Sequence, residues 1–379
     1  MTTFYRYIKG LFIALPVLFA GISFAQKENE SYIISSGCDS LKPGALSAGL
    51  VNNNFVKNNE YFGKFTKGIT YIGSIIQPEI TYAFSGKAGL TVGWYARYFY
   101  GLEKINQSLP VIRFDYRFIK GGRMIFGQLQ GQFNHRLIEP LYSSDNYFEK
   151  NPENGLQLII DKSGINADIW LDWEHFLLPG DSNQEQITAG LNLSYKLINK
   201  EPVSVKACLQ SVIHHHGGQV DVMDTPLQTR LNIAPGLIVG YSPDSRFVTG
   251  ASLSAWLVQA LDQSPTPTLR YLRGYGIYTA ATAENPWATV MAAWWHGKDY
   301  FSPLGDYLFQ SVSELDPFYH RNTRDLLNMK LLLNREIARG VKAGFRFETY
   351  HDLRKNQIDF CYGLNILAQA GWGCKSKKK

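Results

Sequence analysis

Hydrophobic and polar residues alternate with a period of two along most of the chain, in segments of roughly ten residues separated by turn residues. Between residues 90 and 100, Leu90, Val92 and Trp94 share one face, while Thr91 and Arg97 share the other. The pattern recurs in the segments 112–118, 125–134, 165–174, 187–197, 203–213, 231–241, 327–333, 341–349 and 358–366. This period is that of a β-strand and predicts an all-β fold.

The chemistry of the two faces decides between a soluble sandwich and a membrane barrel. Polar faces carry amides or charges in succession, as at Gln128, Gln130 and Gln132, whereas apolar faces contain small residues such as Gly127 and Ala167. A soluble β-sandwich would bury its apolar face and hydrate the other. Strands of this length with lipid outside and a polar lumen inside predict a transmembrane antiparallel up-and-down β-barrel.

The connections between predicted strands alternate between short and long. Short turns fall at 85–87, 121–122, 161–164, 199–201, 243–245, 284–286 and 338–340. Longer loops fall at 102–109, 136–153, 178–185, 215–227, 262–270 and 298–322. In outer-membrane barrels the short turns are periplasmic and the long loops are external. The first clear strand, 67–84, therefore runs inward, so another segment must carry the chain outward before it.

The number of strands depends on that preceding segment. A strand at 44–55 gives an even count of about sixteen, which we favour. Asn52, Asn53 and Asn54 are poor strand residues, however. The alternative is that this stretch threads the lumen as a plug and that the barrel has fourteen strands.

The ends of the chain account for its net charge of +6. Arg6 and Lys9 precede an apolar stretch and a small-residue cleavage site at Ser23-Phe24-Ala25, which predicts a secretory signal peptide. Four lysines form the C-terminal tail. Without these charges the body is neutral, so the sequence gives no support for nucleic-acid binding.

This organisation predicts four regions and a compartment. We expect a signal peptide over 1–25, a periplasmic lead over 26–43, an outer-membrane barrel over 44–369 and a basic tail over 370–379. Past residue 25, no apolar run approaches the roughly 18 residues needed for a membrane-spanning helix. We expect export to the outer membrane of a Gram-negative cell, where lipid surrounds the barrel. The low charged fraction, 18%, fits strands that face hydrocarbon with every second residue.

The polar faces supply candidate pore-lining residues. The predicted set is Arg97, Arg113, Asp115, Arg117, Gln128, Gln130, Gln132, Asp168, Asp172, Glu174, Lys330, Lys342, Arg346 and Glu348. Basic residues slightly outnumber acidic ones on these faces, which favours anions, and opposed rows of charge would sieve polar solutes. Alternatively, the charges pair across a closed lumen and hold it together.

The longest predicted loop, 298–322, is unusually aromatic. Tyr300, Phe301 and Tyr307 lie in it with Asp306. We expect it to form a constriction or a cap at the pore mouth, or else to pack on neighbouring loops.

Sites for catalysis, metals or disulfides are sparse. No Gly-x-Ser-x-Gly occurs, and His214-His215-His216 is the one local histidine cluster, which we interpret as a solvated loop start because consecutive strand residues point alternately. We therefore expect no catalytic residues, no metal and no cofactor, and a chain that is not an enzyme. Cys38 and Cys374 flank the barrel, and their spacing alone does not decide whether they form a disulfide.

Four segments resemble uncharacterised, porin-like outer-membrane β-barrel proteins of Bacteroidota. They are Phe55–Phe62, Asn134–Tyr142, Asn151–Gln157 and Asp168–Glu174. The resemblance spans roughly residues 45–200 and implies the compartment and the fold, but no activity and no functional residues. The chain departs from many outer-membrane barrels by continuing past Trp372 into its lysine-rich tail.

Three functions follow as hypotheses. We favour porin-like passage or binding of small polar solutes. The first alternative is a non-conducting barrel whose loops at 136–153 and 298–322 serve adhesion or an outer-membrane assembly. The second is a channel for hydrophobic substrates with an N-terminal hatch. The sequence names no solute and no oligomeric state.

Overall fold

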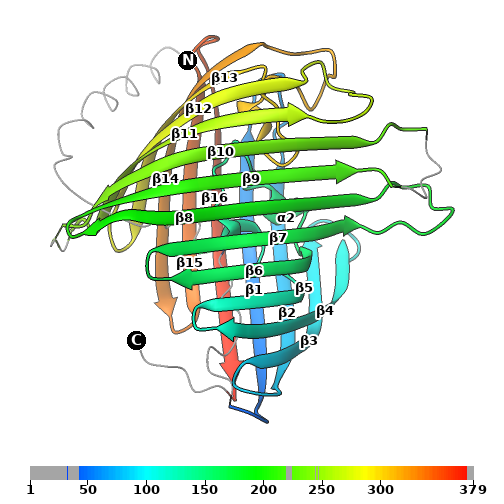
Figure 1. Ribbon diagram of the computed structural model, residues 1–379, viewed down its shortest axis with the longest axis vertical. Helices are drawn as coiled ribbons and strands as arrows, with labels where there is room; N and C mark the ends of the chain where they lie inside the picture. Colours follow the sequence, from blue (N-terminus) through cyan, green and yellow to red (C-terminus); the bar gives the residue numbers. More distant parts are fainter. Residues whose placement is uncertain (1–31, 33–41, 219–223, 244, 246, 374–379) are drawn as a thin grey trace.

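Sixteen antiparallel strands form a closed barrel (Figure 1). The computed structural model describes residue 32 and residues 42–218, 224–243, 245 and 247–373. The barrel confirms the all-β prediction and the count of sixteen, and it excludes fourteen strands. The predicted signal peptide, Cys38, Cys374 and the four lysines of the tail lie outside the described residues.

The elements follow one another as hairpins around the barrel, and each strand pairs with its neighbours in sequence. The strands are β1 Leu46–Glu60, β2 Thr70–Ala83, β3 Ala88–Phe99, β4 Gln107–Ile119, β5 Gly122–Gln128, β6 Asn154–Lys162, β7 Ile165–His175, β8 Gln186–Lys200, β9 Val203–His216, β10 Gln228–Tyr241, β11 Gly250–Asp262, β12 Arg273–Glu284, β13 Ala288–Lys298, β14 Thr323–Ala338, β15 Val341–Asp352 and β16 Gln357–Trp372. In the described residues three short helices lie in loops: η1 Gln132–His135, α2 Asn146–Glu149 and η2 Tyr307–Phe309.

The first and last strands close the barrel by pairing from Ala48↔Trp372 to Glu60↔Phe360. The asparagine-rich stretch lies inside β1, so the alternative that it forms a luminal plug is wrong. Asn53 faces the lumen, where its Nδ2 donates to the Tyr147 hydroxyl at 2.7 Å. Asparagine has a low intrinsic preference for strands, and this buried hydrogen bond stabilises it at this position.

The outer face of the wall is apolar. Val92, Ile112, Leu253 and Leu257 are each more than half exposed there, at 52%, 59%, 63% and 60%. Such a surface is unfavourable in water and matches contact with hydrocarbon. None of the helices in the described residues is both long enough and apolar enough to span a bilayer.

The strand predicted over 125–134 ends early. β5 stops at Gln128, so Gln130 lies in a loop and Gln132 in η1. At Gly127 φ is +103°, and a Cβ atom would lie 2.0 Å from the Ile112 carbonyl oxygen. The backbone turns inward at this glycine, which directs residues 129–153 into the barrel. Ile125, which the alternation placed on the lipid face, is fully buried.

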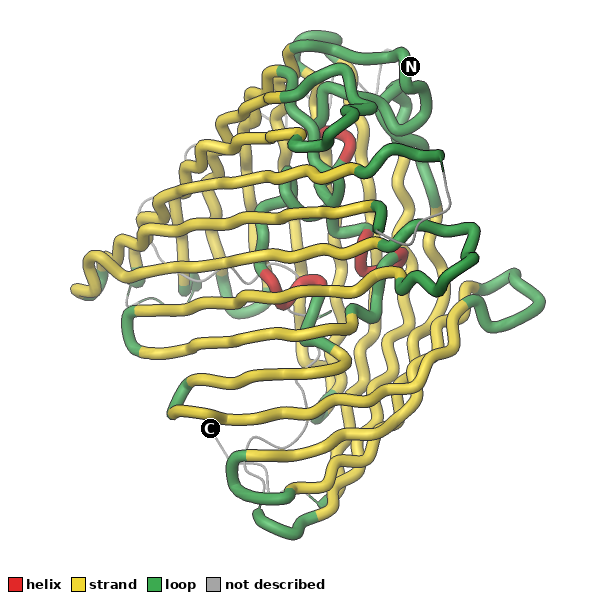
Figure 2. Tube along the Cα trace, turned by 45° about the vertical axis from the view of Figure 1, so that its right-hand side comes forward, coloured by secondary structure: helices red, strands yellow, loops and turns green. Residues whose placement is uncertain are grey.

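Two loops, 129–153 and 299–322, fill the outer part of the lumen, and the short helices lie within the barrel outline (Figure 2). A core cluster joins residues of both loops to inward-facing residues of β9–β16, among them Leu141, Phe301, Phe309, Trp256 and Trp295. The lumen is therefore packed at the end that carries the long loops.

Candidate functional site

The 299–322 loop packs against the 129–153 loop. The Tyr300 hydroxyl donates to the Pro140 carbonyl at 2.7 Å, and the Ser143 amide donates to the Leu304 carbonyl at 2.7 Å. Tyr300, Phe301 and Asp306 are buried, and Tyr307 is half-buried. These residues, expected to form a constriction or cap, thus lie in contact with the neighbouring loop inside the barrel mouth.

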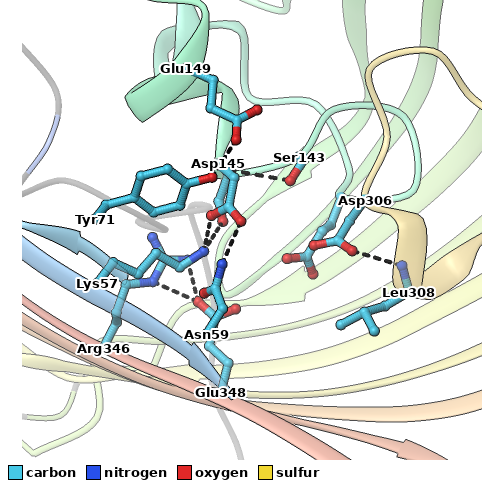
Figure 3. A network of polar contacts seen from close by, with 12 residues as sticks. Lys57, Asn59, Tyr71, Ser143, Asp145, Glu149, Asp306, Leu308, Arg346 and Glu348 are labelled. Atoms are coloured by element: carbon cyan, nitrogen blue, oxygen red, sulfur yellow. Dashed lines mark hydrogen bonds and ion pairs between the residues drawn. The ribbon is translucent and has the colours of Figure 1, made fainter. Parts of the chain in front are cut away.

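A polar network ties both loops to the wall (Figure 3). Lys57 of β1 forms an ion pair with Asp145, and the Asn59 Nδ2 donates to the other oxygen of that carboxylate at 2.7 Å. The Asp306 carboxylate accepts from the Leu308 amide at 2.8 Å. Burial, together with the nearby carboxylates of Glu139 and Asp145, raises the pKa of Asp306 to about 8.

Glu139 connects the 129–153 loop to β14 and β15. Its carboxylate lies 2.8 Å from the Lys330 ammonium and accepts from the Tyr350 hydroxyl at 2.7 Å. Glu348 takes part through Tyr350 and through an ion pair with Arg346. Because these groups are almost fully buried, each charge depends on its partner.

His135, at the end of η1, is held between two carboxylates. Its Nε2 lies 2.6 Å from Glu153 Oε2, and its Nδ1 lies 2.8 Å from Asp168 Oδ2. The imidazole stacks on Trp170 with ring centroids 3.6 Å apart, and Tyr142 donates to Glu153 at 2.5 Å. Burial alone would lower the pKa of His135, but Glu153 and Asp168 outweigh it and raise that pKa to about 10. His135 is therefore an imidazolium at neutral pH.

Two wall amides fix the backbone beside this histidine. The Asn192 Nδ2 donates to the His135 carbonyl at 2.8 Å, and the Gln210 Nε2 donates to the Arg136 carbonyl at 3.0 Å. Arg136 has a positive φ of 53°, a conformation that non-glycine residues seldom adopt. The wall thus holds a strained residue whose side chain points away from the packed loops and into open space.

That space is a cavity of about 450 Å³ between the packed loops and the short-turn end of the barrel. One wall is polar and includes Asn134, Arg136, Gln157, Asp168, Asn192 and Lys206. The opposite wall is apolar and includes Ile238, Trp256, Tyr278, Ala280 and Met291. Asp161, beside the β6–β7 turn, belongs to its short-turn end. Asp168 connects the cavity to His135.

Most of the predicted pore-lining residues face the lumen as separate groups. Asp168, Glu174 and Arg97 contact the 129–153 loop, and Asp172 accepts from the Asn154 amide at the start of β6. Lys330, Arg346 and Glu348 lie on another side of the same loop. Gln128 bonds to Gln77 of β2 at 3.0 Å. Nearer the short turns, Arg113 pairs with Asp115 at 3.1 Å, and Arg117 and Lys342 lie apart from the His135 site. These ion pairs join residues of one strand, as in Arg113–Asp115, or join a strand to a luminal loop, as in Lys330–Glu139.

Sequence reasoning missed His135, Glu153, Tyr142, Glu139 and Arg136. Four of them lie in 136–153, the segment assigned to an external loop, and His135 lies directly before it. Period-two alternation carries no information about where a loop folds. A signal was present nonetheless, since this loop shares with 298–322 a density of aromatic and acidic residues that is unusual for chain in free solvent.

The histidine cluster at 214–216 and the two described cysteines lie outside the His135 site. His214 lies 3.9 Å from Glu174, and His215 bonds to Thr229 at 2.9 Å. Within the described ranges, no group of three or more His, Cys, Asp or Glu side chains is arranged so that it could hold a metal ion. Cys208 and Cys361 are buried free thiols.

Solved structures with the same fold are outer-membrane proteins. OprD of Pseudomonas aeruginosa is 12% identical, with 90% of this chain and 98% of that chain covered and a TM-score of 0.50. OccK2 (OpdF) of the same organism is 10% identical, with 88% and 100% covered and a TM-score of 0.51. The protein therefore has the fold of these outer-membrane β-barrels. No curated protein matches it, and the Bacteroidota resemblance stays a prediction.

The model of one protein family matches residues 38–376, almost the entire chain, and its description is lipid A 3'-O-deacylase-type. This description names an enzyme activity, so the expectation that the chain is not an enzyme is wrong. That expectation relied on the absence of a Gly-x-Ser-x-Gly motif, which is a signature of one hydrolase fold only. On the extent of this match, the chain belongs to the lipid A 3'-O-deacylase-type family.

Proposed function

We propose that the protein hydrolyses an acyl ester of lipid A at the luminal site that contains His135 and Asp168. The single observation that carries this proposal is the His135–Asp168 pair, which lies at the edge of a cavity with one polar and one apolar wall. A lipid ester likewise combines a polar ester group with an apolar acyl chain. The family description supports the choice of reaction and substrate.

The geometry favours attack by water over a covalent intermediate. Both ring nitrogens of His135 are engaged by carboxylates, so the imidazole has no free nitrogen with which to activate a serine or a cysteine. Asp168 lines the cavity and can accept a proton from water as the water oxygen attacks the acyl carbon. The ester C–O bond then breaks, and the alkoxide takes the proton from Asp168, which yields a carboxylic acid and an alcohol.

The charge of His135 supports this sequence of steps. Its imidazolium lies 2.8 Å from Asp168 and is shielded from water, where a fixed positive charge stabilises a developing oxyanion strongly. Gln157 donates to the other oxygen of Asp168 at 2.8 Å and orients the carboxylate. His135 thus acts as a fixed electrostatic group, and Asp168 as the proton acceptor.

The test is release of fatty acid from purified lipid A by the folded barrel, measured by mass spectrometry. Asp168→Asn keeps the shape of the side chain but removes its basicity, and we expect a loss of about 10²–10⁴-fold. His135→Gln should lose activity as well, whereas His214→Gln is the matched control, because His214 also lies beside a carboxylate, Glu174. Heat-modifiable gel migration verifies folding. Fatty acid release at the wild-type rate by a folded Asp168→Asn barrel would refute the proposal.

Binding or passage of small polar solutes is the second candidate function. The observation that favours it is the polar wall of the cavity, where Asn134, Gln157 and Asn192 present amides. Packed loops oppose free passage, because Tyr300 and Phe301 are fully buried between the cavity and the outside. We expect planar bilayers to show no steady conductance with the wild-type barrel and stable steps after deletion of residues 302–309. Stable ohmic steps from the wild type would instead favour a porin.

A further inference from the structure

We propose that the luminal cavity binds a single long-chain carboxylate, with its anionic head at Arg136 and its chain along the wall formed by Trp256, Tyr278 and Met291. The inference rests on the proposed function, because ester hydrolysis releases such a carboxylate. It adds a site that the family description does not name, for the product and for the acyl chain of the substrate.

Arg136 provides the anchor. Its side chain is exposed to the cavity and, within the described part of the chain, forms no ion pair and no side-chain hydrogen bond. Lys206 lies on the same polar wall and experiences the positive charges of Arg136 and Lys196.

The acidic residues of the cavity do not neutralise this anchor. Asp168 faces His135, and Glu139 faces Lys330 at 2.8 Å. Asp161 lies at the short-turn end, beside the β6–β7 turn. In the part of the chain that the structure describes, none of these three carboxylates pairs with Arg136. A guanidinium binds a carboxylate in bidentate geometry.

The apolar wall of the cavity determines which chain can follow the anionic head of the ligand. Trp256 and Met291 are almost fully buried and face inward from β11 and β13, and Ala280 leaves room between them. A volume of about 450 Å³ lies within the range of small-molecule sites and has room for one acyl chain, but not for several. One chain with one anionic head fits both the volume and the division into two walls.

The experiment is photolabelling of the full-length barrel with a myristate that carries a diazirine near its methyl end, followed by peptide mapping. Strand alternation provides an internal reference, because Trp256 and Met291 face the lumen, whereas Leu257 and Ala292 face outward. We expect saturable labelling of the inward pair, displaced by unlabelled myristate but not by myristyl alcohol or inorganic phosphate. Labelling of the outward pair should not saturate.

Arg136→Gln should weaken saturable labelling at least tenfold, which corresponds to loss of one charge-assisted contact. Arg321→Gln is the matched control, since Arg321 pairs with Asp352 in another loop. Labelling confined to Leu257 and Ala292, equal labelling of the Arg136→Gln barrel, or displacement by phosphate alone would each overturn the proposal. Because the probe is a product, the result does not depend on turnover. Saturable labelling of a barrel that releases no fatty acid would refute the proposed hydrolysis and leave the binding site standing.

Discussion

Raising the pH from 6.5 to 10 should remove the stabilisation that protonated His135 gives to the barrel. The pKa of its imidazole is about 10 in the folded protein, against 6.5 as its ordinary value. A raised pKa means that folding favours the protonated form, so the stabilisation is complete below pH 6.5 and is lost as the pH rises through 10. At 1.36 kcal/mol per unit, the difference corresponds to about 5 kcal/mol, of which about 2 kcal/mol is lost by pH 8.

Asp306 also loses stabilising free energy as the pH rises, but at lower pH than His135 does. Its pKa is raised from 3.8 to about 8, so its carboxyl group favours folding while it is protonated, and that contribution is lost as the pH rises through 8. Above pH 8 the contribution of Asp306 is largely lost, so a difference between the wild type and His135→Gln in the interval from pH 8 to 10 reports on His135. An Asp306→Asn variant should remove the early part of the pH dependence and keep the late part.

The assay is urea unfolding of the barrel in detergent, followed by heat-modifiable gel migration at pH 6, 8 and 10. The wild type should lose free energy of unfolding across both intervals. His135→Gln should be less stable than the wild type at pH 6 and should show a flatter dependence above pH 8, because lysine and tyrosine titration is common to both proteins. An equal slope above pH 8 in the two proteins would refute the assignment of a charged imidazole.

Two substitutions test other parts of the structure. Gly127→Ala should destabilise the barrel by roughly 2 kcal/mol or more, because the positive φ is unfavourable for alanine and the new Cβ would meet the Ile112 carbonyl. Gly101→Ala is the control in the same urea assay. Gly101 also has a positive φ but no atom near the position of a Cβ, so this substitution should cost less. Glu139→Gln should cost about 3 kcal/mol by breaking its buried pair with Lys330; unchanged unfolding would show that this contact does not hold the loop in place.

The wall of the barrel could be predicted from the sequence because strand alternation is a local property. Val92 and Thr91 face opposite sides whatever the remainder of the chain does, and closure follows from the cost of unpaired backbone in lipid. The alternation misleads at Gln130 and Gln132, where a polar pattern continues by coincidence after the strand has ended at Gln128. Nothing local in the sequence marks the inward turn except a glycine.

The luminal site could not be predicted for a related reason. His135 and Glu153 are separated by 18 positions and meet Asp168 only because the intervening chain folds into the barrel. The asparagines of β1 show the same dependence, since Asn53 is explained by Tyr147, 94 positions away. Contacts of this kind are set by the tertiary structure, and propensity and periodicity do not register them.

The pairing of β1 with β16 fixes the order in which the protein assembles. Lys57 on β1 holds Asp145 of one luminal loop, while Arg346 and Glu348 lie on β15, near the other end of the chain. The outer lumen is therefore incomplete until nearly the whole chain has been delivered to the membrane, and the loops can settle only against a closed wall. A barrel arrested before its last strand would be open-edged, and its luminal loops would lack the closed wall against which they pack.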